Sequence, residues 1–214
     1  IVIGMDTRAS GTKLADAIMG ILDCNFIDVG IAPTPAVEFA VRHFNADGGI
    51  IITASHNEPY WNGFKFLNSD GSSLSENDMN IVINNSKTFR DFHKIQERKI
   101  LEKNSEAVKE YTGFILSIIG RENIENIRNS RQKIVIDPNG GTAAIAKKIL
   151  EQAGVEGSDR TPRDSGIPQV ASARQKLHVD VRRCNALGLR LIRRHTAGEK
   201  NLHVFKLAVI KRAR

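Results

Sequence analysis

Gly49-Ile50-Ile51-Ile52-Thr53-Ala54-Ser55-His56-Asn57 is the stretch of sequence that decides the fold. Its first four residues form an apolar run that is typical of a buried strand. The run ends abruptly in small and polar residues, and Glu58-Pro59 cannot continue a strand. A hydroxyl, an imidazole and an amide are therefore expected at the carboxyl end of a strand, which is the edge where open α/β sheets bind ligands.

The polar residues of this stretch have two interpretations. Ser55, His56 and Asn57, together with Lys65 after Asn62-Gly63-Phe64, suit phosphate chemistry, in which a protein mostly positions groups and neutralises charge. A helix N-cap or an Asx-type turn is the structural alternative. The Ser-His-Asn tripeptide alone does not decide between them.

Strands and helices alternate along the first part of the chain, which predicts a layered α/β domain with a mixed sheet. Ser10 is expected to cap the first helix, Thr34 the second with Pro35 at its first position, and Ser105 a later one. Ser75 and Asp78 form a capping arrangement. The predicted strands lie at residues 1–3, 26–29, 49–52, 64–67 and 133–137.

A second βα unit begins near residue 133, with a tight loop at 138–141 and a helix at 142–153. Gly140-Gly141 is not a dinucleotide fingerprint, because GxGxxG is incomplete. After Gly154 the pattern fails, since a polar segment and then Pro162 and Pro168 stand where the chain should return to the sheet.

Composition limits the classes of function. The chain has 214 residues, is 41% hydrophobic and contains no apolar run long enough to predict a membrane span. No secretory leader opens it, and Cys24 and Cys184 form no metal-spaced pair, so we expect a cytoplasmic, reduced protein. It begins inside a strand without a methionine, which predicts that residues precede it.

The net charge of +7 belongs to the end of the chain. Residues 1–154 carry a net charge of −2 and residues 155–214 one of +9. Nucleic-acid binding through Arg190, Arg193 and Arg194 is one reading of this basic segment. Its only aromatic residue is Phe205, so a solvated segment is the favoured reading, and nucleic acid is not the expected partner.

Four segments together resemble the α-D-phosphohexomutases, the family of phosphoglucomutase, phosphomannomutase and phosphoglucosamine mutase. They are TASHNEPYWNGFKF at 53–66, GMDTRASG at 4–11, VGIAPTPAVEFAVRHFNADGGI at 29–50 and KIVIDPNGG at 133–141. The resemblance covers about residues 1–154. Trp61 beside Asn62 is similar to the phosphoglucosamine mutase form of the loop, although the sequence does not select the hexose.

The resemblance implies an isomerase that moves a phosphoryl group between two positions of a phosphorylated hexose. Ser55 would carry the phosphoryl group, Lys65 would handle a proton or neutralise phosphate, and His56 would orient the loop or the substrate. Arg8 would contact phosphate, and its structural alternative is a pair with Asp6. Asn57 would fix the loop. The implied cofactors are Mg²⁺, with one ligand from the phosphate on Ser55, and a hexose 1,6-bisphosphate as activator.

The sequence departs from the family after residue 154, where no acidic Asp-Gly-Asp-x-Asp-Arg metal loop follows. We therefore predict a phosphoserine domain at 1–85, its helical remainder and a linker at 86–131, the start of a second domain at 132–154, and an unassigned basic tail at 155–214. Two hypotheses remain: a mutase fragment, or a catalytically incomplete product whose tail comes from truncation or a shifted reading frame.

Overall fold

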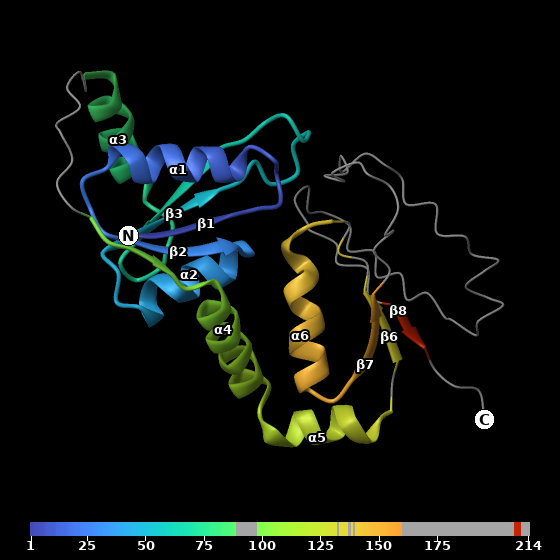
Figure 1. Ribbon diagram of the computed structural model, residues 1–214. Coiled ribbons are helices and arrows are strands. Elements are labelled where there is room, and N and C mark those ends of the chain that lie inside the picture. Colours follow the sequence, from blue (N-terminus) through green and yellow to red (C-terminus); the bar gives the residue numbers. More distant parts are fainter. Residues whose placement is uncertain (89–97, 132, 137, 139, 160–207, 211–214) are drawn as a thin grey trace. The chain divides into compact units, whose positions relative to one another are not determined.

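The computed structural model describes residues 1–88, 98–131, 133–136, 138, 140–159 and 208–210 (Figure 1). The chain divides into two compact units, with the boundary between Tyr111 and Thr112 inside one helix. Each unit is considered separately below. The domain limits that the sequence suggested stay predictions.

The first unit is built on a five-stranded sheet with the order β4-β3-β1-β2-β5. Strands β1, β2, β3 and β5 run parallel, and β4 pairs antiparallel with β3. This confirms the predicted layered α/β domain with a mixed sheet. The strands are β1 (Val2–Met5), β2 (Phe26–Ile31), β3 (Gly48–Ile52), β4 (Phe64–Asn68) and β5 (Ile100–Glu102).

Helices α1 (Gly11–Ile21) and α2 (Thr34–His43) cover opposite faces of this sheet (Figure 1). Successive strand residues point to opposite faces, so β1 and β3 must be apolar throughout to supply both cores. Val2 and Ile51 join the cluster under α2, whereas Ile3 and Ile50 join the cluster under α1. The apolar run at 49–52 is thus buried on both sides.

Two glycines let α2 approach the sheet closely. A Cβ atom on Gly4 would lie 2.5 Å from Cγ2 of Val37, and one on Gly49 would lie 2.7 Å from Cγ2 of Val41. Both distances are shorter than real Cβ contacts, so larger residues at these positions would push the helix away.

Of the three predicted helix caps discussed next, the structure confirms one and contradicts two. The arrangement before α3 (Glu76–Thr88) is confirmed, because the amide of Asp78 donates to Oγ of Ser75 at 3.2 Å. The cap predicted for Ser105 is wrong: α4 (Asn104–Ile119) begins one residue earlier, and the Asn104 side chain donates to the Val29 carbonyl. Helix α2 likewise includes Thr34, with Pro33 at its N-cap.

The second unit contains a three-stranded sheet with the order β7-β6-β8 and a small apolar cluster around Ile134. After α6, β7 pairs parallel with β6, so the expectation that the α/β pattern stops after Gly154 is wrong. Small and polar residues form this strand because pairing with β6 outweighs their weak β-propensity. The elements are α5 (Arg121–Asn129), β6 (Lys133–Ile136), a 3₁₀ turn (Thr142–Ala144), α6 (Ile145–Gln152), β7 (Glu156–Asp159) and β8 (Ala208–Ile210).

Most of the basic tail, including Cys184, Arg190, Arg193, Arg194 and Phe205, lies outside the described residues. Of the helices that are described, none combines the length and the apolar character needed to cross a membrane.

Candidate functional site

The candidate site lies where the chain direction reverses about β1. The chain leaves β1 through α1 to reach β2 on one side, then passes through α2 to β3 on the other side. This is the topological switch point at which open α/β sheets bind ligands beyond the carboxyl ends of their strands. The loop after β1 and the loop after β3 meet there, and the Asp6 amide donates to the Ile52 carbonyl at 3.0 Å.

Ser55 lies on the loop after β3, which we call the serine loop and define as residues 53–63. No helix begins within it, since β4 follows at Phe64, so the helix N-cap interpretation of Ser55 is excluded. The Ser55 side chain is exposed and its φ angle is +55°, in the left-handed region that non-glycine residues seldom adopt. Its conformation therefore needs support from the surroundings.

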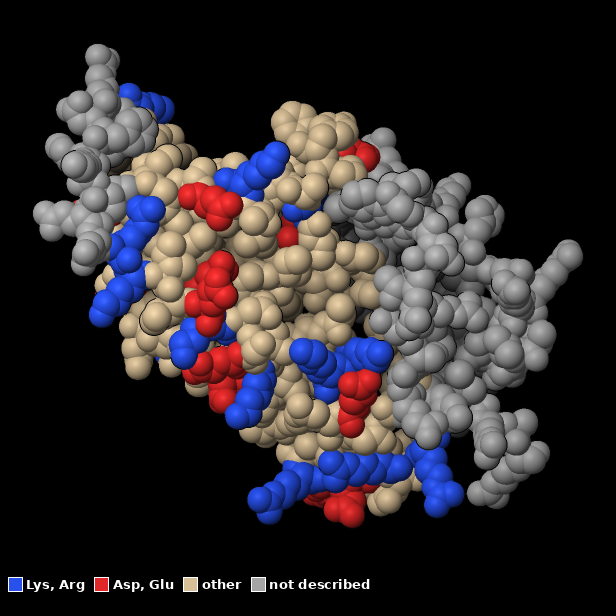
Figure 2. Space-filling model, in the orientation of Figure 1, with Lys and Arg blue, Asp and Glu red and all other residues tan. Residues whose placement is uncertain are grey.

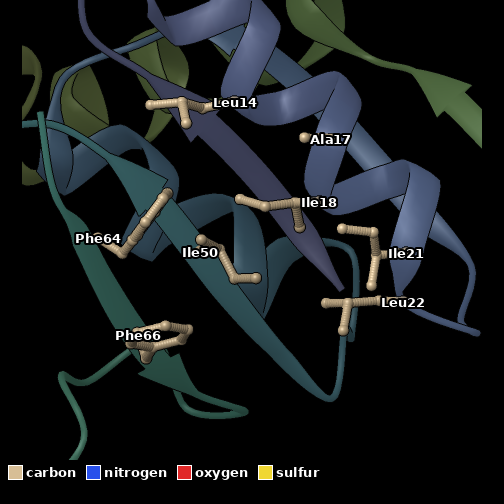
Figure 3. A pocket seen from close by; sticks show the side chains of 8 residues that line it. All are labelled: Leu14, Ala17, Ile18, Ile21, Leu22, Ile50, Phe64 and Phe66. Atoms are coloured by element: carbon tan, nitrogen blue, oxygen red, sulfur yellow. The ribbon is translucent and has the colours of Figure 1, made fainter. Parts of the chain in front are cut away.

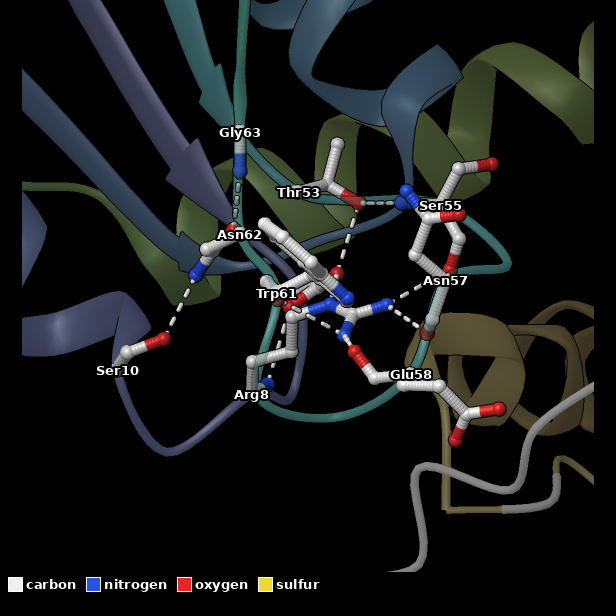
Figure 4. A network of polar contacts seen from close by, with 10 residues as sticks. Arg8, Ser10, Thr53, Ser55, Asn57, Glu58, Trp61, Asn62 and Gly63 are labelled. Atoms are coloured by element: carbon white, nitrogen blue, oxygen red, sulfur yellow. Dashed lines mark hydrogen bonds and ion pairs between the residues drawn. The ribbon is translucent and has the colours of Figure 1, made fainter.

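That support comes from Arg8, which lies beneath the serine loop with its side chain only 1% exposed (Figure 4). Its Nη1 donates to the carbonyls of Glu58 (2.6 Å) and Trp61 (3.0 Å). Its Nη2 donates to the carbonyls of Ser55 (3.0 Å) and Asn57 (2.9 Å). One guanidinium thus ties four carbonyls of a single loop together, which we call the Arg8 clamp.

Asp6 completes the clamp from the other side. Its carboxylate accepts from Nε of Arg8 at 2.9 Å and from the Thr53 hydroxyl at 2.7 Å, and that hydroxyl accepts from the Ser55 amide at 3.0 Å. The buried cation therefore has both a counter-charge and a full set of acceptors, which is the condition for burying it at acceptable cost.

A second tie fixes the far end of the serine loop. The Asn62 side chain donates to Oγ of Ser10 at 2.9 Å and accepts from the Gly63 amide at 2.9 Å. Ser10 occupies the N-cap position of α1 but makes no capping hydrogen bond with its side chain. The sequence prediction for Ser10 is therefore corrected: its hydroxyl serves the serine loop.

The structure brings four of the five predicted site residues together, and it shows Arg8 in the pair with Asp6 that was the alternative to a phosphate contact. The hydrogen bonds from Arg8 to the four carbonyls were not predicted. Ser55, His56 and Asn57 are exposed on the serine loop, whereas Arg8 is buried under it. The predicted contact between Arg8 and phosphate would require the guanidinium to release its carbonyls. Lys65 is exposed on β4 opposite Ile51, and none of the described hydrogen bonds or ion pairs joins it to the loop.

Sequence reasoning considered Asp6 only as an ion-pair partner of Arg8, and it assigned no role to Thr53. The signal that could have found them is the Asp-x-Arg spacing of residues 6–8 after the first strand, combined with a threonine just after β3. Tyr60 and Trp61 are also exposed on the loop, at 78% and 59%, with ring centroids 5.9 Å apart.

The described residues contain no group of three or more His, Cys, Asp or Glu side chains that could hold a metal ion such as Mg²⁺. Two carboxylates lie at the serine loop, and Asp6 is already bonded to Arg8 and Thr53, which leaves Glu58 within the loop. The described part of the chain therefore does not fit the complete magnesium site that the resemblance implies.

Two surface features do not form part of the site. An apolar groove of about 270 Å³ lies between α1 and strands β3 and β4, and its lining offers no partner for phosphate (Figure 3). Basic and acidic side chains are mixed over the described residues of the face in Figure 2, so that face carries no extended patch of one sign. The groove is lined by Leu14, Ala17, Ile18, Ile21, Leu22, Ile50, Phe64 and Phe66.

Comparisons with known proteins agree on one family. Residues 1–91 match the family described as phosphoglucomutase/phosphomannomutase, alpha/beta/alpha domain I. A phosphoglucomutase/phosphomannomutase of Thermococcus kodakarensis is 40% identical over 153 residues, covering 70% of this chain and 33% of the relative. A phosphoglucosamine mutase of Clostridium botulinum strain Loch Maree is 34% identical over 166 residues, covering 73% and 35%.

Solved structures share the fold. The crystal structure of a phosphoglucomutase/phosphomannomutase family protein from Burkholderia thailandensis aligns with a TM-score of 0.54 at 22% identity, covering 74% of this chain and 34% of that one. The chain thus spans about a third of the length of the curated relatives that it matches.

Proposed function

This chain belongs to the phosphoglucomutase/phosphomannomutase family, and on that premise we propose that it is the phosphoserine-bearing part of a phosphohexomutase, with Ser55 as the phosphoryl carrier. The observation that supports the proposal best is the placement of Ser55, exposed at the switch point and held in a left-handed conformation by a buried clamp. Strained backbone that the surroundings enforce is common at functional sites.

The proposed reaction is an exchange of phosphoryl groups. The bond between Oγ of phospho-Ser55 and phosphorus breaks as a free hydroxyl oxygen of a hexose monophosphate bonds to that phosphorus, and the hydroxyl proton ends on Oγ. The resulting bisphosphate then returns its other phosphoryl group to Ser55 by the reverse step. No oxidant or further reactant is needed.

The chain's own residues contribute positioning and charge. The Arg8 clamp holds the serine loop, and the exposed ammonium of Lys65 on the adjacent strand can neutralise phosphate or move a proton. His56 and Asn57 flank the carrier and are proposed to contact the substrate or shape the loop. A hexose 1,6-bisphosphate is the proposed activator and Mg²⁺ the proposed cofactor, although the described residues do not supply the complete metal site.

Phosphoryl loading of Ser55 is the direct test. The chain is incubated with ³²P-labelled glucose, mannose or glucosamine 1,6-bisphosphate, and the label is mapped by mass spectrometry. Ser55→Ala should abolish the label, whereas Ser72→Ala, at another exposed serine of the same unit, should retain it. Label on a different serine with Ser55 bare would overturn the proposal, and the relative rates of the three donors rank the hexoses.

A turnover measurement distinguishes two possibilities for this chain: an active mutase, and a folded phosphoserine domain that is catalytically incomplete. A coupled assay with Mg²⁺ and bisphosphate should give far less than the 10 per second or so of an ordinary enzyme, because a bound metal ion normally supplies several kcal/mol of transition-state stabilisation. Turnover near that rate would show that this chain supplies ligands which the described residues do not reveal.

A further inference from the structure

We propose that Arg8 is a positioning residue that turns the backbone N–H groups of the serine loop outward, so that they form an anion-binding rim for the phosphoryl group on Ser55. The proposal rests on the proposed function for the identity of the anion. It assigns to the buried clamp a part in phosphate binding without any contact between Arg8 and phosphate.

Peptide geometry supports the first step. In a trans peptide unit the C=O and N–H bonds point in opposite directions, and the described residues contain no cis peptide. Because the carbonyls of Ser55, Asn57 and Trp61 point at Arg8, the N–H groups of the following residues point away from it. Those N–H groups belong to His56, Glu58 and Asn62. The fourth carbonyl, of Glu58, precedes Pro59, which has no N–H to offer.

At His56, which is exposed, the direction away from the buried Arg8 leads toward solvent, whereas Glu58 and Asn62 are half-buried. The Arg8 side chain is 1% exposed, while Ser55, His56 and Asn57 are all exposed. The N–H groups of Ser55 and Asn57 are bonded within the loop, to the Thr53 hydroxyl and the Ala54 carbonyl, so they are not members of the rim. The outward N–H groups of His56, Glu58 and Asn62 therefore all follow Ser55 along the loop.

The charge of Arg8 strengthens these donors. A cation bound to a carbonyl polarises the peptide unit and makes its N–H a better donor, in the way that hydrogen bonds in a chain reinforce one another. Only arginine can do this at four carbonyls, because its planar fork presents several donors in fixed directions, whereas lysine is a single point charge. Arg8→Lys is therefore the informative substitution, since it keeps the charge and removes the fork.

The second pKa of phospho-Ser55, followed by ³¹P NMR, tests the proposal. A solvated phosphoserine has a second pKa of about 6, and hydrogen bonds to the dianion lower it. We expect a lower value in the wild-type chain and a return toward about 6 in Arg8→Lys. Arg42→Lys, an exposed arginine of the same unit, should leave it unchanged. His56 and Glu58 are kept in every variant, so their charges contribute equally.

A purely structural role for Arg8 would lower the melting temperature of Arg8→Lys without moving the phosphoserine pKa, and that result would overturn the proposal. A wild-type pKa of about 6 or above would also overturn it, and this measurement does not depend on any variant folding.

A titration with inorganic phosphate separates this inference from the proposed function. In the unphosphorylated chain, the ¹H–¹⁵N signals of His56 and Glu58 should shift when phosphate is added. The dissociation constant for phosphate should be about tenfold larger in Arg8→Lys than in the wild-type chain. If Ser55 never accepts label but these signals still respond in this way, the proposed function fails and the anion rim stands. If Ser55 is labelled while both chains bind phosphate alike, the rim fails and the carrier stands.

Discussion

The sheet of the first unit and the serine loop at its edge are held by different forces. The sheet is stabilised by apolar burial on both faces, through many interchangeable contacts. The loop is stabilised by one buried cation that binds four carbonyls and one carboxylate. The sheet therefore tolerates gradual change, whereas the loop depends on a few polar ties with fixed geometry, of which the Arg8 clamp is the largest.

Phe26→Ala should have the largest effect on the sheet. Phe26 is fully buried under α1, so its removal leaves a cavity and should lower the free energy of unfolding by about 3–5 kcal/mol. Urea denaturation measures the loss, and the exposed Ile21→Ala serves as control. The folded fraction should still load Ser55. A cost below about 1 kcal/mol would mean that this core is not tightly packed.

Arg8→Met should be almost as costly and should act on the loop as well. It leaves Asp6 without its counter-charge and four carbonyls without donors. Breaking this buried pair should lower the free energy of unfolding by about 3 kcal/mol. Unlike Phe26→Ala, it should also abolish loading of Ser55 in the folded chain. Normal loading in a folded Arg8→Met chain would show that the loop holds its shape without the clamp.

The sheet was easier to predict from the sequence than the Arg8 clamp, because the signals for the sheet lie within a few residues of one another and the clamp joins residues far apart along the chain. The apolar run at 49–52 and the Ser75–Asp78 cap depend on neighbours within a few residues, and both were predictable. The carbonyls bound by Arg8 lie 47 to 53 residues further along the chain, and backbone acceptors leave no mark in a sequence. The strand Glu156–Asp159 escaped prediction for a related reason, because β6 imposes it.

Thr53→Val should have a smaller effect on the serine loop than Arg8→Met. The change keeps the shape of the side chain but removes the hydroxyl that links Asp6 to the Ser55 amide. We expect a loss of about 1–2 kcal/mol from the unpaired groups, together with slower loading of Ser55. Thermal unfolding and the loading rate should be measured on the same samples. An unchanged loading rate would limit the positioning role to Arg8.

Ser55→Gly should have the smallest effect on stability, and in the opposite direction. Glycine adopts a φ of +55° without the steric cost of about 1–2 kcal/mol that serine bears, but it loses about 0.5–1 kcal/mol more conformational entropy on folding. The variant should therefore be more stable by about 0.5–1 kcal/mol while losing all label. Ser55→Ala is the matched control, since it loses the label and keeps the strain. Equal stability of the two variants would indicate that the loop relaxes once the hydroxyl is gone.

Trp61 gives the serine loop an optical signal of its own. It is the only tryptophan in the chain, the residue is 59% exposed, and its carbonyl is one of the four that Arg8 binds. All indole emission of this protein therefore originates at one point of the loop, without any added dye. Selective excitation of the indole, with iodide as a quencher, would follow the loop in real time during the proposed loading of Ser55.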